Sequence, residues 1–452
     1  MTYTFSCMNH FAMYYYYYIF FFIFKKKTKD DAPHLLYFSN NCPKTQKTQQ
    51  TEMTGENINI VIPYRLQWEL DDTLPLWKDL EENHNINFIR YKITTAQDFQ
   101  NWLPTSKCHG IWMTEEFCSI LGGPSPFLKF LPDTIRVMLV PWVGVDYVLN
   151  HNEIKWLREE KNCLVVNVGP NAADSVCELA IHLVTSVFRM TSFWEFLIKF
   201  VEFGKISNCR DYLGTDLNNI EDLQFICKNG DVKTINYYQF PQKLKMEEDC
   251  SKVANVVQNF KVGGKHIISP MRKTVLILGF GSIGRTIGYR LNRAFDMKIQ
   301  YYKRSGPISQ DQLGYKAEYM SDLNDPRTWS EADLIMLSLP GGISTDDMIN
   351  DKTLAMCKGG VRLVNVGRGN SVDEDALLRA LENGKVASCG LDVFKNEGSG
   401  QINKKLLQRW DVTALPHMGS AVTDMMSLQT LVTLQNIENI FVNNGNGVYP
   451  VE

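Results

Sequence analysis

The chain has 452 residues, which is too long for one ordinary domain and enough for two or three. With 44% hydrophobic and 21% charged residues, its composition is that of a globular protein and excludes a wholly disordered chain. The 47 Lys and Arg residues nearly balance the 50 Asp and Glu residues, and the net charge of −3 excludes a general basic field that would bind nucleic acid or an anionic membrane surface.

The N-terminal region has an unusual composition. Of the 19 Tyr and 24 Phe residues, fourteen lie within the first 38 positions, and residues 11–24 read FAMYYYYYIFFFIF before Lys25–Lys27. This run is shorter than the roughly 20 residues that cross a bilayer, and five consecutive tyrosines make a poor signal-peptide core, so we expect no stable membrane span. Two interpretations of residues 1–52 stay open: a membrane-proximal anchor, and a disordered leader or mis-assigned start before Met53. The second is favoured because an ordinary strand follows at 57–63.

Cysteine usage indicates a reducing compartment. The eleven cysteines are scattered, with no CxxC pair and no Cys/His cluster at metal-ligand spacing. We therefore expect a cytoplasmic protein without disulfides and without a bound metal. Cys389, which lies in an apolar strand pattern, is expected to be a small core residue.

From Asn57 onward, short β-rich runs alternate with helical stretches. The predicted strands of this first series are Ile58–Ile62, Ile86–Tyr91, Gly110–Met113, Ile135–Val140 and Leu164–Val168. The predicted helices, with apolar residues at three- and four-residue spacing, are Asp72–Asn83, Ala96–Leu103, Glu116–Leu121 and Asn152–Lys161. This alternation predicts a parallel sheet with helices on both faces.

A second series of the same kind follows a less regular stretch. We expect one long, mostly apolar helix over Asn171–Phe203, and then an insertion of unknown role at 204–271, rich in Asn, Asp, Lys and Gln. The predicted strands of the second series are Val275–Leu278, Lys298–Tyr302, Leu334–Ser338, Val361–Asn365, Ala387–Asp392 and Val412–Leu415. Its predicted helices are Ile283–Phe295, Asp373–Glu382 and an amphipathic helix over Thr423–Asn443. The sequence thus predicts an α/β protein with two parallel-sheet domains.

The first motif that carries chemistry is a glycine-rich turn between a strand and a helix. Residues 279–284 read GFGSIG, directly after the strand VLIL. Gly279 permits the tight turn, Gly281 lets the backbone approach a pyrophosphate, and Gly284 lets the helix pack on the strand. The free N–H groups of the helix that opens with Ser282 and Ile283 would then face the phosphates. The motif predicts a dinucleotide-binding site.

The residues after the next strand indicate which dinucleotide is preferred. A fold selective for NAD usually ends this strand with an acidic residue that accepts from the ribose hydroxyl. Here Lys303, Arg304 and Ser305 follow the strand instead. Two cations and a hydroxyl suit a 2′-phosphate, so we expect NADPH to be preferred over NADH.

Three further side chains follow the ends of three successive strands. They are Arg368 in VGRGNSVD, Glu397 in GLDVFKNE and His417 in LPHMGSA. Ligands collect at this edge of an open α/β sheet. For reduction of a 2-keto acid, Arg368 can bind the carboxylate and polarise the ketone, and His417 can donate a proton to the ketone oxygen. Glu397, if paired with the imidazole, would orient it and raise its pKa.

With these motifs in order, the chain resembles the D-isomer-specific 2-hydroxyacid dehydrogenase family, and within it the glyoxylate/hydroxypyruvate reductase branch. The resemblance rests on GFGSIGR, LVNVGRGNSVDEDALLRAL, GLDVF with its Glu, and PHMGSA, with 29 residues from Arg368 to Glu397 and 20 from Glu397 to His417. It implies a flavodoxin-like substrate (lid) domain over 53–170, completed by 418–452, and a Rossmann NAD(P)-binding domain over 171–417 that carries the insertion.

The resemblance also implies roles for further positions. On the substrate side they are Val143, Gly144, Val145 and Asn171, and on the cofactor side Pro340, Val366, Asp392 and Gly419. It implies a homodimer. One departure is Gly398, where the family usually has a proline after the glutamate, so the loop of Glu397 is expected to be looser.

We therefore interpret the sequence as that of an enzyme, a reductase of small 2-keto acids that uses NADPH. Its expected catalytic residues are Arg368, Glu397 and His417. The alternative is a dinucleotide-sensing, corepressor-like binding protein with little turnover, in which the insertion at 204–271 would dock a partner. The presence of all three catalytic residues argues for the enzyme.

Overall fold

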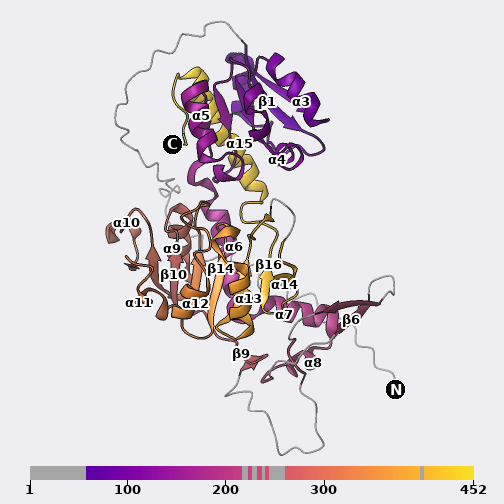
Figure 1. Ribbon diagram of the computed structural model, residues 1–452, viewed down its shortest axis with the longest axis vertical. Coiled ribbons are helices and arrows are strands. Elements are labelled where there is room, and N and C mark those ends of the chain that lie inside the picture. The colour runs from indigo at the N-terminus through magenta and orange to yellow at the C-terminus, as the bar shows by residue number, and fades with distance from the viewer. Residues whose placement is uncertain are drawn as a thin grey trace, which may run out of the picture. The chain divides into compact units, whose positions relative to one another are not determined.

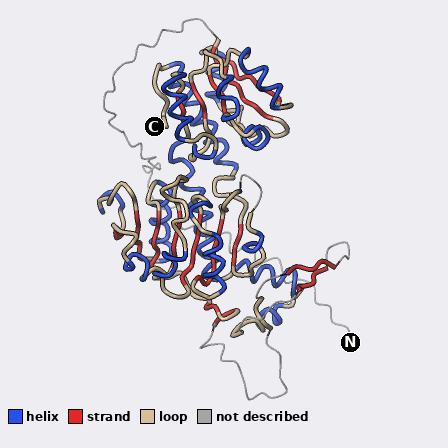
Figure 2. Tube along the Cα trace, viewed as in Figure 1, coloured by secondary structure: helices blue, strands red, loops and turns tan. Residues whose placement is uncertain are grey.

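The computed structural model describes residues 57–215, 222–226, 232–236, 240–243, 260–397 and 402–451. The expectations for residues 1–52, for much of the insertion and for Gly398 lie outside these residues. Figure 1 shows the arrangement of the helices and strands, and Figure 2 separates them by type.

The first series forms a five-stranded parallel sheet in the order β2-β1-β3-β4-β5, which is the flavodoxin-like order. Its strands are β1 (Ile58–Tyr64), β2 (Ile86–Lys92), β3 (Gly110–Trp112), β4 (Val137–Leu139) and β5 (Leu164–Val166). The helices between them are α2 (Pro75–Asn83), α3 (Ala96–Trp102), α4 (Glu115–Leu121) and α5 (His151–Lys161). The prediction of this sheet is confirmed, with strand ends that differ by up to two residues.

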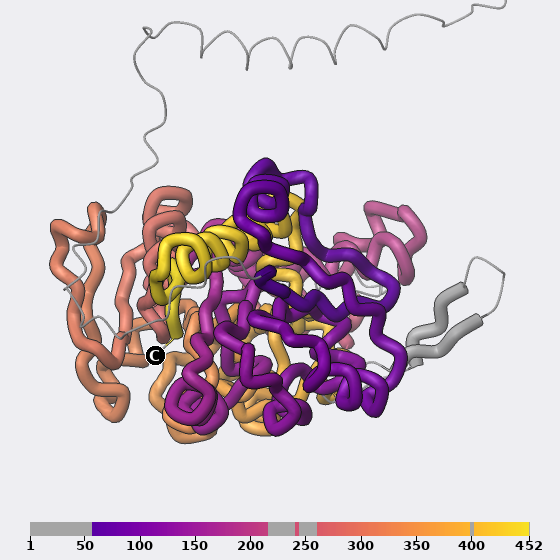
Figure 3. Tube along the Cα trace, turned by 90° about the horizontal axis from the view of Figure 1, so that it is seen from above, coloured from indigo at the N-terminus to yellow at the C-terminus, as the bar shows by residue number. Residues whose placement is uncertain are grey.

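Each face of the first sheet has its own apolar core. Val61 and Ile111 point toward α3, α4 and α5, where Phe99, Phe117 and Leu157 are fully buried. The alternate residues Ile58, Ile60, Ile62 and Trp112 pack with Trp77 and Leu80 of α2 and with Leu434 and Ile437 of α15 (Thr423–Ile437). The last long helix of the chain therefore covers the sheet that the first strands build, as Figure 3 shows from above.

The second series forms a seven-stranded parallel sheet in the order β12-β11-β10-β13-β14-β15-β16. Its strands are β10 (Thr274–Leu278), β11 (Lys298–Tyr302), β12 (Ala317–Tyr319), β13 (Leu334–Leu337), β14 (Val361–Asn365), β15 (Val386–Leu391) and β16 (Val412–Ala414). Its helices are α9 (Ser282–Phe295), α10 (Gln310–Leu313), α11 (Pro326–Ser330), α12 (Asp351–Met356), α13 (Glu374–Glu382) and α14 (Lys404–Leu407). The first six strands have the Rossmann order 3-2-1-4-5-6, so the predicted fold class is confirmed.

Alternate residues of the second sheet face opposite layers. Val275 and Ile277 of β10 pack against α6 (Ala173–Arg189) and α9, whereas Leu276 and Leu278 face the layer of α11, α12, α13 and α14. Because side chains alternate along a strand, a strand covered on both faces is largely apolar, and all five residues of β10, of which only Thr274 is polar, are buried. Cys389 on β15 is fully buried, as expected of a core residue.

The single long helix expected over Asn171–Phe203 is broken. The chain forms η4 (Gly169–Ala172) and α6, and Met190 then takes a left-handed conformation with φ 53° before α7 (Thr191–Phe196) and η5 (Leu197–Val201) continue. Apolar periodicity continues on both sides of Met190, so the pattern does not reveal the bend. Within the described residues no single helix is long and apolar enough to cross a bilayer, and the pair Gly169–Arg189 and Thr191–Val201, bent by 76°, meets that test only when taken together.

Parts of the expected insertion form regular structure. They are α8 (Ile206–Arg210), the antiparallel pair β6 (Asp222–Ile226) and β7 (Val232–Asn236), and the antiparallel pair β8 (Lys261–Val262) and β9 (Lys265–His266). A separate apolar cluster joins this region to the end of the second sheet, with Phe193, Tyr212, Phe240, Val262 and Trp410 among its buried residues. The described parts of the insertion thus contain helix and strand, which the polar composition of the segment did not indicate.

The C-terminal helix also differs from its prediction. It ends as α15 at Ile437 and continues as a π-turn, η8 (Glu438–Val442). Its buried residues include Gln429, Thr430, Thr433 and Asn436, so it is not the simple amphipathic helix expected. Asn436 donates to the carbonyl of Asn167 (3.0 Å), and its side-chain oxygen accepts from the amides of Val448 and Tyr449 (2.7 and 3.2 Å). These polar side chains are buried because they bind the loops around the helix.

Candidate functional site

Three adjacent parallel strands end at the candidate site. Strands β14, β15 and β16 are neighbours in the second sheet, and Arg368, Glu397 and His417 follow them within six residues. The carboxyl ends of parallel strands meet at one edge, so these side chains emerge on the same side of the sheet.

The imidazole of His417 is paired with Glu397. Nδ1 of His417 lies 3.0 Å from Oε2 of Glu397, and Oε1 of Glu397 accepts from the amide of Phe394 (3.2 Å). The hydrogen bond to Glu397 raises the pKa of His417, against burial and the positive charge of Arg368, which lower it. A carboxylate on Nδ1 leaves Nε2 as the nitrogen that can face a substrate and exchange a proton with it.

The backbone at His417 is held by Asp392. His417 has φ 56°, a left-handed conformation that is uncommon for a residue other than glycine and marks local strain. The His417 amide donates to the carbonyl of Asp392 (2.9 Å), and the carboxylate of Asp392 accepts from the amides of Met418 (2.7 Å) and Gly419 (2.9 Å). Burial raises the pKa of Asp392, although these two amides counteract the effect. Asp392, expected on the cofactor side, therefore also fixes the loop that carries the histidine.

The guanidinium of Arg368 is paired with a carboxylate from the loop that follows β4 of the first sheet. Nε and Nη2 of Arg368 each lie 3.0 Å from an oxygen of Asp146, and Nη1 donates to the carbonyl of Gly367 (2.9 Å). Asp146 lies in η3 (Val145–Tyr147), after β4. Asp146 directly follows the expected substrate-side residues Val143, Gly144 and Val145, but its pairing with Arg368 could not be predicted, because a pair 222 residues apart leaves no local signal.

Two residues that the sequence did not single out, Asn365 and Ser371, shape the loop of Arg368. Asn365, fully buried at the end of β14, donates from Nδ2 to the carbonyl of Arg368 (2.9 Å) and accepts from the amide of Gly367 (3.0 Å). Ser371 donates from Oγ to the same carbonyl (2.6 Å). A Cβ at Gly369 would lie 1.9 Å from the backbone of Phe394, so this loop packs directly on the loop of Glu397. The small and amide residues of NVGRGNS are the only local signal for this arrangement.

The loop after β4 lies against Arg368. A Cβ on Gly144 would stand 1.7 Å from Nη2 of Arg368, so glycine permits the approach. Within the described chain, neither the amide of Val143 nor that of Gly144 donates to a protein acceptor, which leaves both for a ligand. Val145 is buried beneath this loop. Asn171 donates to the carbonyl of Val168 (2.5 Å), and no described hydrogen bond joins it to Arg368 or His417.

The glycine-rich turn has the shape that a dinucleotide needs. Gly279 has φ 93°, and a Cβ there would lie 2.6 Å from the carbonyl oxygen of Ser338. A Cβ on Gly284 would lie 2.3 Å from the carbonyl oxygen of Gly279, so the helix is packed on the turn. At Gly281 a Cβ would meet nothing within 4 Å, and this glycine caps α9, which begins at Ser282 and Ile283, without a side-chain hydrogen bond. The residues therefore fit a pyrophosphate in front of a 14-residue helix.

The basic residues after β11 are available to an anion. Nη1 of Arg304 lies 3.4 Å from Oγ of Ser344, and no carboxylate among the described residues pairs with Lys303 or Arg304. Ser305 is exposed beside them. Pro340, exposed after β13, and Val366, buried after β14, lie at the same carboxyl edge of the sheet.

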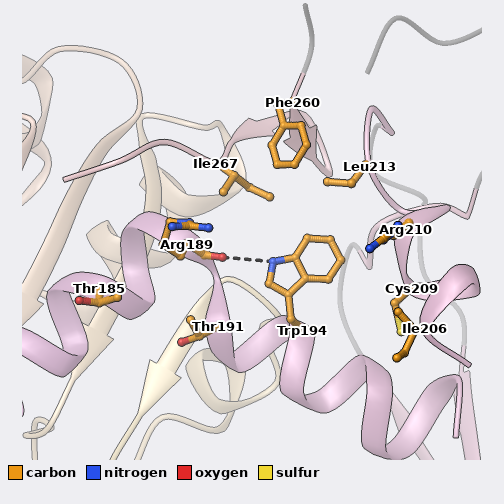
Figure 4. Close-up of a pocket in the computed structure, with 10 residues that line it drawn as sticks. All are labelled: Thr185, Arg189, Thr191, Trp194, Ile206, Cys209, Arg210, Leu213, Phe260 and Ile267. Carbon is orange, nitrogen blue, oxygen red and sulfur yellow. Dashed lines mark hydrogen bonds between the residues drawn. The ribbon is translucent and has the colours of Figure 1, made fainter. Parts of the chain in front are cut away.

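A pocket of about 480 Å³ lies elsewhere, between α6, α7, α8 and the segment around β8 and β9 (Figure 4). It is lined by Thr185, Arg189, Thr191, Trp194, Ile206, Cys209, Arg210, Leu213, Phe260 and Ile267. The indole of Trp194 donates to the carbonyl of Arg189 (3.1 Å) across its floor. None of the residues expected to bind substrate or cofactor lines this pocket. In the described part of the chain, no group of three or more His, Cys, Asp or Glu side chains is placed to hold a metal ion.

The amino-acid sequence is similar to those of known 2-hydroxyacid dehydrogenases. The family model described as D-isomer specific 2-hydroxyacid dehydrogenase, NAD binding domain, matches residues 246–419. A protein of Saccharomyces cerevisiae named for the 2-hydroxyacid dehydrogenases is 49% identical over 390 residues, which are 86% of this chain and 95% of that protein.

Solved structures of similar fold cover most of the chain. A glyoxylate reductase from Paecilomyes thermophila has a TM-score of 0.64 at 22% identity, covering 88% of this chain and 99% of its own. An NADPH-dependent glyoxylate/hydroxypyruvate reductase from Sinorhizobium meliloti, solved with NADP and malonate, has a TM-score of 0.60 at 21% identity, with coverages of 88% and 97%. At these identities the likeness concerns the fold.

Proposed function

The chain belongs to the D-isomer-specific 2-hydroxyacid dehydrogenase family and is thus an NAD(P)-dependent dehydrogenase, and we propose that it reduces a small 2-keto acid of the glyoxylate or hydroxypyruvate type to the D-2-hydroxy acid. The observation that carries this proposal is the His417–Glu397 pair, which lies at the same sheet edge as Arg368 and within reach of its charge. Two of the similar folds belong to proteins named as reductases of these keto acids.

In this proposal the protein supplies a proton and holds the substrate. NADPH, when bound, supplies the hydride for the keto carbon. His417 donates a proton from Nε2 to the keto oxygen, while Glu397 keeps the imidazole charged and oriented. Arg368 binds the substrate carboxylate and polarises the keto oxygen, and the amides of Val143 and Gly144 add neutral donors to the same carboxylate.

A preference for NADPH over NADH is part of the proposal. Lys303 and Arg304 carry two charges that no described carboxylate neutralises, at the position where a fold selective for NAD has an acid. The NADP-bound neighbour from Sinorhizobium meliloti has the same fold and is named NADPH-dependent.

The activity is tested by mixing the purified protein with NADPH and a panel of 2-keto acids and following the absorbance of NADPH. We expect oxidation with glyoxylate or hydroxypyruvate, and a fall in kcat of about 10²–10⁴ in His417→Gln because the proton donor is lost. No oxidation with any keto acid would contradict the proposal. His182→Gln, which changes an exposed histidine of α6 away from the site, is the matched control and should keep wild-type rates.

The cofactor preference is tested by Arg304→Asp. The new carboxylate repels a 2′-phosphate and can accept from a ribose hydroxyl, so the ratio of kcat/KM with NADPH to that with NADH should fall by at least about tenfold. Arg272→Asp, at an exposed arginine before β10, is the control. An unchanged ratio in Arg304→Asp would show that this strand end does not select the cofactor.

The proposal also includes that the protein is cytoplasmic and forms a homodimer. Each cysteine that the structure describes is a free thiol, as a reducing compartment favours. Three large apolar side chains around α8, those of Phe203, Ile206 and Phe260, are 46–61% exposed and offer a surface to a second copy. Sedimentation velocity tests the dimer, and imaging of a tagged chain in cells tests the cytoplasmic location.

A further inference from the structure

We propose that Asp146 is a positioning residue that orients the guanidinium of Arg368 toward the carboxylate of the substrate. The inference rests on the proposed function, since it assigns to Arg368 the task of binding a keto acid. It adds a residue that the family motifs did not assign a role.

Some of the five N–H groups of Arg368 donate to the protein, and the others remain for a ligand. Asp146 accepts from Nε and from Nη2, both at 3.0 Å, and the carbonyl of Gly367 accepts from Nη1 at 2.9 Å. An arginine has one N–H on Nε and two on each terminal nitrogen. The protein therefore holds three of them, and one N–H remains on Nη1 and one on Nη2. These two N–H groups, one on each terminal nitrogen, remain available to a carboxylate.

Glycines on both sides allow this close pairing. A Cβ on Gly144 would lie 1.7 Å from Nη2 of Arg368, and a Cβ on Gly341 would lie 2.2 Å from Oδ2 of Asp146. The pair thus lies between the backbone after β4 and the backbone after β13. Because the loop with Asp146 also presents the amides of Val143 and Gly144, one loop both orients the arginine and offers donors to the same substrate group.

Stability does not account for the pair. The side chains of Arg368 and Asp146 are 28% and 41% exposed, and ion pairs exposed to this degree contribute little to folding. Orientation is a different matter, because a displacement of about 1 Å of a group that binds substrate can lower a rate by about 10²-fold. The expected effect of losing Asp146 therefore concerns substrate binding and turnover.

A competing role for Asp146 makes the opposite prediction. If its carboxylate occupied the place of the substrate carboxylate and had to leave, removing it would free the arginine and tighten the binding of carboxylates. The arrangement favours orientation, because the two bonds to Asp146 leave the remaining donor pair of Arg368 unused.

The test is calorimetric titration of oxamate, an unreactive 2-keto acid analogue, into the NADPH-saturated wild type and Asp146→Ala. We expect at least tenfold weaker binding of oxamate and a 10- to 100-fold lower kcat/KM in Asp146→Ala, from a higher KM and a lower kcat, with NADPH affinity within about twofold of the wild type. Asp146→Asn, which keeps one acceptor oxygen, should lose less. Asp351→Ala removes a similar bidentate partner, that of Arg379, from an exposed site elsewhere and is the matched control.

Each other outcome has a distinct meaning. Equal or tighter binding of oxamate by Asp146→Ala overturns the positioning role. Absence of oxamate binding to the wild type also overturns it, because Arg368 then holds no carboxylate. If the wild type binds oxamate but reduces no keto acid, the proposed function fails, and weaker binding by Asp146→Ala still supports the positioning role.

Discussion

At the scale of single residues, the protonation of His417 connects geometry with activity. The hydrogen bond with Glu397 raises the pKa of the imidazole above its ordinary value of 6.5. A raised pKa means that the protonated form persists to higher pH, so reduction, which consumes this proton, should be fast below the raised pKa and fall as the pH rises through it. The pair also stabilises the folded state while the imidazole is charged, and that contribution is lost over the same rise in pH.

Glu397→Gln should therefore move the pH profile. Without the carboxylate the pKa of His417 returns toward its ordinary value, and the alkaline limb of kcat/KM for reduction should shift to lower pH, with a lower maximum as well. The measurement is the rate with NADPH over about pH 5–9, a range that contains the titration of histidine. Glu153→Gln, at the exposed glutamate that accepts from the amide of Asn150 at the start of α5, is the control and should leave the profile in place. A profile that is identical in Glu397→Gln and wild type would mean that another group controls the alkaline limb.

Also at this scale, local motifs and distant partners differ in how well they can be predicted. Arg368, Glu397 and His417 could be selected because each follows a recognisable strand and stands in a short pattern. The sequence raised the pairing of Glu397 with His417 only as a condition, and the structure places the two side chains 3.0 Å apart. Asp146 was missed as a partner, because its pairing with Arg368 depends on how two loops far apart in sequence meet in space.

At the scale of elements, runs of β-branched and apolar residues were enough to place most strands. Strand β12 (Ala317–Tyr319) was missed because it reads AEY and buries only its first residue, so it shows no apolar run. The helices α10, α11, α12 and α14 were missed because each has at most six residues, too few to show a helical period. The bend at Met190 could not be predicted, since methionine is a good helix former and its left-handed backbone depends on the packing around it. In α15 the buried positions could not all be predicted, because the polar residues Gln429, Thr433 and Asn436 are buried and apolar periodicity does not include them.

At the scale of the whole molecule, the end of the insertion is joined to the second sheet by buried charges. The ammonium of Lys265, on β9, lies 2.5 Å from Oδ2 of Asp411, and Arg409 makes two bonds of 2.8 Å to the same carboxylate. Their side chains are at most 6% exposed. Burial alone would raise the pKa of Asp411, but the positive charges of Lys265 and Arg409 hold this pKa below its usual range. Nearby, Arg362 donates to the carbonyl of His266 (2.8 Å), so the hairpin of β8 and β9 is held at two points.

Removing the central carboxylate should therefore destabilise the whole fold. Asp411→Ala leaves the charges of Lys265 and Arg409 buried without a partner, and breaking a buried pair in this way costs about 3–5 kcal/mol. Urea unfolding followed by circular dichroism measures the loss, and Asp351→Ala, at an exposed ion pair, should cost no more than ~1 kcal/mol. Because no hydrogen bond or ion pair links Asp411 directly to Arg368, Glu397 or His417 in the described chain, the folded fraction of Asp411→Ala should keep a kcat/KM within about twofold of the wild type, as additivity of distant sites suggests. A loss below about 1 kcal/mol would instead mean that water or a rearrangement satisfies the two cations, since an uncompensated buried charge cannot cost so little.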